Sequence, residues 1–93
     1  MRPTRQRVGN LIMVGREDIS EYALRTIVSL RSVGDETVVL KGRGDNISKA
    51  IDVFNEVKRR IGDVIELVGV NIGSERAGSR KTSFIEIVIK MKG

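Results

Sequence analysis

The sequence has 93 residues, the length of one domain, and its 17 Lys and Arg against 12 Asp and Glu give a net charge of +5. It contains no Cys and no His, which excludes disulfides, zinc–thiolate sites and the commonest general base of enzymes. No apolar stretch approaches the length of a membrane span and no signal-peptide pattern is found, so we expect a cytoplasmic protein with no membrane association and no cofactor. The excess of positive charge favours a nucleic acid as partner; solubility alone is the alternative reason for it.

The first half of the chain predicts a basic arm, two strands and a helix. Residues 1–7 are rich in Arg and contain no acid, so we expect a flexible basic arm. Residues 8–14 are mostly apolar and predict the first strand. Asp18-Ile19-Ser20-Glu21 has the form of a capping box and predicts a helix that runs to about Val33 and is closed by Gly34. Residues 36–41 predict the second strand.

The second half predicts a helix and a hairpin. Apolar residues at helical spacing predict a helix over residues 46–61, with Asp45 or Asn46 as its cap. Residues 64–72 and 84–91 predict two strands, and the polar residues 73–82 predict the hairpin loop between them. The order βαβαββ predicts an α+β fold, a two-layer α/β sandwich with two helices on one face of a mixed four-stranded sheet, as a single domain over residues 8–93.

The junction between the second strand and the second helix reads Lys41-Gly42-Arg43-Gly44. The two glycines allow the backbone to approach another group closely, and the two cations, with Lys49 on the helix, favour an anion as that group. The spacing lacks the third Gly of a dinucleotide fingerprint and the Gly-Lys-Ser/Thr ending of a Walker loop. We therefore expect a phosphate contact at this junction.

Further cations recur along the chain. Arg16 follows the first strand, and the predicted hairpin loop carries Arg76, Arg80 and Lys81. A flexible basic hairpin can reach along a nucleic acid, and an ordinary polar turn is the alternative. The chain has one Tyr, two Phe and no Trp, all expected in the core, so base stacking on single strands is disfavoured. This pattern favours phosphate contacts with little sequence reading.

The carboxylates predict neither catalysis nor a metal site. Asp52 and Glu56 lie four residues apart, but a solvated helix face on which Glu56 pairs with Arg59 or Arg60 is the simpler reading.

The second helix carries more apolar residues than one small sheet covers, because Val53 and Val57 lie beside its main apolar stripe. We therefore expect a dimer built on this helix and the neighbouring strand edge. The predicted interface residues are Val53, Phe54, Val57 and Ile61.

From residue 8 to residue 92 the chain resembles the Alba family, small basic chromatin proteins of archaea. The resemblance rests on Lys41-Gly42-Arg43-Gly44 followed by Ile47-Ser48-Lys49-Ala50-Ile51-Asp52, with Gly15 after the first strand and Gly73-Ser74 before the last one. It implies a homodimer that binds double-stranded DNA and RNA with little sequence preference and condenses DNA in the nucleoid; whether dimers associate on the DNA is left open. By position it implies that Lys41 and Arg43 contact the nucleic acid from the body of the dimer. It also implies that Arg76, Arg80 and Lys81 contact it from the hairpin.

One departure from the family pattern follows the first strand. Where the family often has two Lys, this chain has Arg16 and Glu17. Arg binds phosphate but is not acetylated as Lys is, and the Glu carboxylate repels phosphate, which implies a lower affinity and a divergent second copy of the family. The small subunits of ribonuclease P resemble the same family. An RNA-binding subunit of a ribonucleoprotein, or an RNA chaperone, is therefore the alternative function, and an enzyme with a phosphate ligand at the glycine junction is the third.

Overall fold

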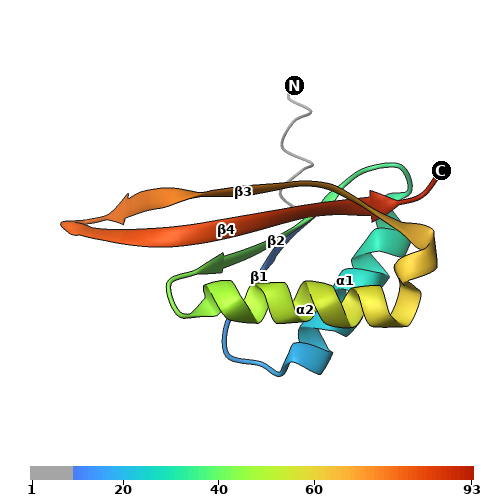
Figure 1. Cartoon of the computed structure of the whole chain (residues 1–93), viewed down its shortest axis with the longest axis horizontal. Helices are drawn as coiled ribbons and strands as arrows, with labels where there is room; N and C mark the ends of the chain where they lie inside the picture. The colour runs from blue at the N-terminus through green and yellow to red at the C-terminus, as the bar shows by residue number, and fades with distance from the viewer. Residues whose placement is uncertain (1–9) are drawn as a thin grey trace.

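The computed structural model describes residues 10–93, and its elements follow the predicted order (Figure 1). They are β1 (Leu11–Met13), α1 (Ile19–Val33), β2 (Val38–Arg43), α2 (Asn46–Ile61), the 3-10 turn η2 (Gly62–Val64), β3 (Ile65–Ala77) and β4 (Arg80–Met91). The basic arm expected over residues 1–7 lies outside the described residues. So do residues 8 and 9 of the first predicted strand, which is short where it is described.

The strands form one mixed sheet in the order β1-β2-β4-β3. β1 pairs with β2 in parallel, whereas β4 pairs antiparallel with both β2 and β3. β2 and β3 therefore run in the same direction with β4 inserted between them. Both helices lie on one face of the sheet (Figure 1). The predicted α+β fold is confirmed.

The core lies between the sheet and the helices. Alternate residues of β2 and β4, such as Leu40 and Ile89, are fully buried on the helix side. Val53 and Val57 of α2 are also 0% exposed. The prediction that they form an additional apolar edge is therefore wrong. Because α2 packs against both α1 and the sheet, it buries a broad face inside a single protomer, and these two side chains have no surface left for a partner.

The loop predicted over residues 73–82 is also wrong, because the strands continue through it. Pairing runs without a break from Gly73 with Phe84 to Ala77 with Arg80, and Gly78 and Ser79 alone form the turn. Gly78 has φ +66°, which suits the first central position of a tight hairpin turn. The sequence does not indicate these strand residues, because both faces of the ribbon meet solvent and its strands therefore lack the alternation of apolar and polar residues.

The helix starts are in the predicted places, but the capping side chains do not act as predicted. Asp18 and Asp45 occupy the N-cap positions, and neither makes a side-chain capping hydrogen bond. Glu21, the expected partner in a capping box, instead accepts a hydrogen bond from Arg25. The close of α1 at Gly34 is confirmed, with φ +65° at that residue.

Candidate nucleic-acid interface

The glycines of the β2–α2 junction serve the protein's own packing. A Cβ added at Gly42 would overlap the carbonyl oxygen of Asn46 and lie 2.9 Å from its carbonyl carbon. Gly44 has φ +53°, and its N–H donates to the carbonyl oxygen of Ser83 over 2.8 Å. The group that the Gly42 backbone approaches is therefore the first turn of α2, and the anion contact expected at this junction stays a prediction. The glycines act indirectly, because they fix the backbone on which the neighbouring cations are carried.

Lys41 and Arg43 lie on the face of the sheet that the helices leave open. Their cross-strand partners on β4 are Glu86 and Phe84, which alternate with the buried isoleucines of that strand. Lys41 Nζ donates to Glu75 Oε1 over 3.1 Å, and Arg43 Nε lies 2.7 Å from Glu75 Oε2. Both predicted phosphate-binding residues are thus paired with one carboxylate, a contact that sequence reasoning missed.

Two further groups complete the surroundings of Lys41. Its ammonium lies 3.6 Å from Glu86 Oε2 and 4.7 Å from the centre of the Phe84 ring. Its side chain is 14% exposed, whereas that of Arg43 is 52% exposed. Arg43 is therefore the more accessible of the two cations. The hydrogen bond from Lys41, reinforced by the charge of Arg43, holds the pKa of the Glu75 carboxyl below its usual value.

The β1–α1 loop presents Arg16 at the same end of the sheet. Tyr22, which is buried, accepts a hydrogen bond from the Gly15 N–H over 2.8 Å and donates one to Glu17 Oε1 over 2.7 Å. The hydrogen bond from Tyr22 lowers the pKa of the Glu17 carboxyl below its ordinary value. Arg16 is exposed, and no ion pair links it to any residue in the range 10–93.

Lys49 has a structural contact in this loop. Its Nζ donates to the carbonyl oxygen of Gly15 over 2.6 Å and lies 5.6 Å from the centre of the Tyr22 ring. Lys49 was predicted as a phosphate contact; the structure places its ammonium on the backbone that carries Arg16. Its charge remains beside that loop, but its position favours support of the loop over direct contact with a ligand.

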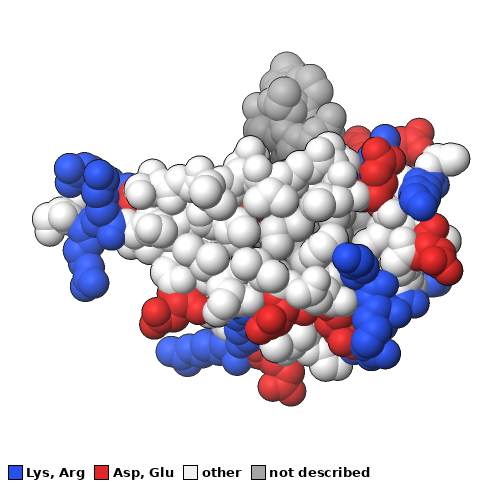
Figure 2. Space-filling view, in the orientation of Figure 1, with Lys and Arg blue, Asp and Glu red and all other residues white. Residues whose placement is uncertain are grey.

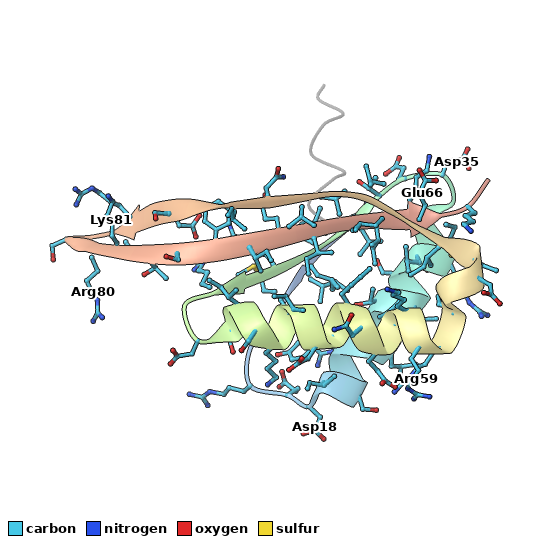
Figure 3. The ribbon with its side chains drawn as sticks, viewed as in Figure 1. Asp18, Asp35, Arg59, Glu66, Arg80 and Lys81 are labelled. Carbon is cyan, nitrogen blue, oxygen red and sulfur yellow. The ribbon has the colours of Figure 1, made fainter. Side chains whose placement is uncertain are left out.

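The hairpin projects past β2 and carries cations at its tip. Beyond the pairing of Arg43 with Phe84, β3 and β4 have no third strand beside them within residues 10–93, and about four more residues of each strand at roughly 3.4 Å apiece give an arm of about 14 Å. Figure 2 shows the positive charge gathered at this tip, and Figure 3 shows Arg80 and Lys81 on opposite sides of it. Arg76, Arg80 and Lys81 are exposed and form no ion pair within the described part of the chain.

The remaining charged and aromatic residues largely follow the sequence analysis. Glu56 pairs with Arg59 and Arg60 as predicted, and these hydrogen bonds lower its pKa to about 2. Tyr22 is buried as expected, whereas Phe54 and Phe84 are half-buried. Within residues 10–93 no three acidic side chains gather as metal ligands do. No helix in that range is long and apolar enough to cross a membrane.

An apolar strip of α2 and β3 is left uncovered in the single chain. Val70 and Ile72 pair with the buried Ile87 and Ile85, so they face the helix side of the sheet, yet they are 49% and 78% exposed. Figure 2 shows the uncharged area that results across β3 and the adjoining side of α2. The strip consists of Ile51, Phe54, Ile61, Leu67, Val70 and Ile72. It contains Phe54 and Ile61 of the predicted interface, which stays a prediction; the sequence analysis expected a neighbouring strand edge there as well but named no residue of β3.

Known proteins resemble the chain along most of its length. A family model described as Alba matches residues 10–74. The DNA/RNA-binding proteins Alba 2 of Saccharolobus solfataricus and Saccharolobus shibatae are 36% and 38% identical over 85 residues, which are 91% of this chain and 94% of each relative. Among solved structures, Alba from Thermoplasma volcanium matches with a TM-score of 0.76 at 26% identity, over 87% of this chain and 99% of that chain.

Proposed function

The chain belongs to the Alba family, and we propose that it is an architectural protein that binds double-stranded DNA, and RNA, as a homodimer with little sequence preference. Its role is binding and not catalysis, in line with relatives that are named for binding DNA and RNA. In the cell this activity would place the protein on the chromosome, where it packages DNA. The divergent loop at Arg16 and Glu17 and the likeness to two proteins named Alba 2 both suit a second copy of the family.

One observation carries this proposal: the cations converge on one end of the sheet. Arg16 follows the end of β1, Arg43 ends the neighbouring parallel strand β2, and the hairpin projects from the same end. The N-terminus of α2, whose dipole favours anions, lies there as well. These cations are spread from the end of the sheet to the tip of the hairpin. Such a spread suits a long polyanion better than a small phosphate ligand.

The chemistry of these groups favours contact with the phosphate backbone. The described cationic end offers guanidinium and ammonium groups, and neither of the aromatic rings named there stands free: Phe84 is half-buried beneath the ammonium of Lys41, and Tyr22, which contacts the β1–α1 loop, is buried. Reading of single-stranded bases needs exposed rings for stacking, whereas phosphate contact does not. Duplex binding with a steep salt dependence is therefore the expected mode, with log affinity falling by about 0.9 for each phosphate neutralised.

A second copy of the chain is the proposed cover for the apolar strip. β3 is one of the two edge strands of the sheet, and exposed apolar residues on an edge strand promote association unless a partner buries them. Phe54 of α2 and Leu67 of β3 line one hollow, so the strip joins the helix to the strand, and two identical strips can face each other about a twofold axis. A dimer of this kind brings together the cations of two protomers and doubles the number of phosphates that one particle contacts.

The dimer is tested by replacing Ile72 with Asp, which buries a charge at the proposed interface but leaves the protomer core untouched, because Ile72 is 78% exposed. Light scattering at micromolar concentration should report a dimer for the wild type and a monomer for Ile72→Asp. Val28→Asp is the matched control, because Val28 is 55% exposed on α1, outside the strip. A monomeric wild type, or a dimeric Ile72→Asp, would contradict the proposed interface.

Nucleic-acid binding is tested with duplex DNA, duplex RNA and single strands of one length at equal salt. Duplex DNA of several sequences should bind alike, and Arg43→Ala should weaken binding to all of them by roughly tenfold, as expected for loss of a charge-assisted contact. Arg59→Ala removes the same charge at the end of α2 remote from the hairpin tip (Figure 3) and should change little. A preference for single-stranded RNA would favour the ribonucleoprotein or chaperone alternative.

A further inference from the structure

Glu75 reaches two cations that lie two strands away from it. It sits on β3 at the base of the projecting hairpin, and β4 separates β3 from the strand that carries Lys41 and Arg43. Strands that are not neighbours lie about 10 Å apart, a gap that only long side chains bridge. Here one carboxylate spans it with both oxygens, Oε1 at 3.1 Å from Lys41 Nζ and Oε2 at 2.7 Å from Arg43 Nε.

This arrangement is the one that a nucleic-acid phosphate would adopt. A phosphodiester, like a carboxylate, offers two anionic oxygens to neighbouring cations, and Arg in particular binds both groups through its planar fork. With Glu86 at 3.6 Å from Lys41, the two cations of the body face two carboxylates, and the cluster is close to neutral. The hairpin tip differs, since its cations have no such partner within residues 10–93.

We propose that Glu75 is an internal competitor of the phosphate: its carboxylate holds Lys41 and Arg43 in the free protein and is displaced when a nucleic acid docks on the body. This inference rests on the proposed function. It assigns two stages to binding, in which the unpaired cations of the tip attract the nucleic acid and the body engages it after Glu75 has moved. The exchange is feasible because the side chains of Glu75 and Arg43 are 33% and 52% exposed, so water screens their pairing.

The test compares Glu75→Gln with Glu66→Gln. Gln keeps the shape of the side chain and removes its charge. Glu66 is a matched control, because it lies on the same strand, at the end of β3 away from the hairpin tip, and gives the same change in net charge (Figure 3). Affinity for one DNA duplex is measured by fluorescence anisotropy over a range of salt, and circular dichroism verifies the fold of each variant.

Glu75→Gln should bind roughly three- to tenfold more tightly near 0.1 M salt, with a salt slope steeper by about 0.9 for each freed site, whereas Glu66→Gln should stay within about twofold of the wild type. If Glu75 acts through Arg43, the gain should be largely lost in the Arg43→Ala background. Weaker binding by Glu75→Gln would show that the carboxylate positions the cations for phosphate, and equal effects of both variants would show net charge alone; either result overturns the inference. Failure of the wild type to bind any nucleic acid would instead contradict the proposed function.

Discussion

Replacement of Gly42 by Ala tests why the junction motif contains its first glycine. The added Cβ would lie 2.9 Å from the carbonyl carbon of Asn46 and 3.0 Å from the Cβ of Ala50, and it would overlap the Asn46 carbonyl oxygen. Carbon atoms pack at about 3.5–4.0 Å, so α2 must move away from β2 by at least about half an ångström. Because the obstructing atoms are backbone atoms of Asn46 and the Cβ of an alanine, no rotamer change relieves the overlap.

Overpacking of a core costs typically about 1–3 kcal/mol, and a clash with backbone falls at the upper end, so we expect Gly42→Ala to lose about 2–3 kcal/mol of unfolding free energy. For a domain of this size that is roughly 10–20 °C in melting temperature. Lys41 and Arg43 flank Gly42, so affinity for duplex DNA should fall as well. The measurements are urea denaturation at one fixed protein concentration and anisotropy on the same samples.

Gly69→Ala is the matched control, because a Cβ at Gly69 meets nothing within 4 Å and its φ is not positive. It should be neutral or stabilising by up to about 1 kcal/mol, through the reduced freedom of the unfolded chain. An unchanged denaturation midpoint for Gly42→Ala would refute the close packing of α2 on β2 as the reason for this glycine. Loss of affinity without loss of stability would point to direct contact of the Gly42 backbone with the ligand.

Three further predictions concern the hairpin, the β1–α1 loop and α2. Replacing Arg76, Arg80 and Lys81 together by Ala should lower affinity, flatten the salt slope and shorten the nuclease footprint while leaving the dimer intact; an unchanged footprint and slope would show that the arm does not touch nucleic acid. Tyr22→Phe removes the acceptor of the Gly15 N–H and the donor to Glu17, and should lower the unfolding free energy, measured by denaturation, by about 1–2 kcal/mol. A negligible loss would show that water replaces the hydroxyl. Because the pKa of Glu56 is lowered to about 2, its ion pairs stabilise the fold above the ordinary pKa of 4.5, and this stabilisation is lost as the pH falls from 4.5 toward 2. The melting temperature of Glu56→Gln should therefore fall less than that of the wild type over this pH range. Parallel pH profiles of the two proteins would contradict the ion pairs with Arg59 and Arg60.

The order of elements, the α+β fold and the Glu56 ion pairs were predictable from the sequence because each depends on residues close together in the chain. Helical spacing over residues 46–61 and the apolar runs of β2 and β4 are local signals. The position of Arg43 between a strand and a helix follows from the same local signals, and it made Arg43 a candidate phosphate contact. Family resemblance rested on the same short motif, Lys41-Gly42-Arg43-Gly44.

The tertiary structure alone decided what each of these residues faces. Val53 and Val57 have the same helical spacing whether they face a partner or their own protomer, and only the packing of α2 against both α1 and the sheet buries them. The pairing of Lys41 with Glu75 joins residues 34 positions apart across an intervening strand, and no pattern in the sequence indicates it. The hairpin shows the same limit, since hydrogen bonding between two solvated strands leaves no periodicity in their side chains. Local spacing sets which element a residue belongs to, and contacts between remote segments set its neighbours.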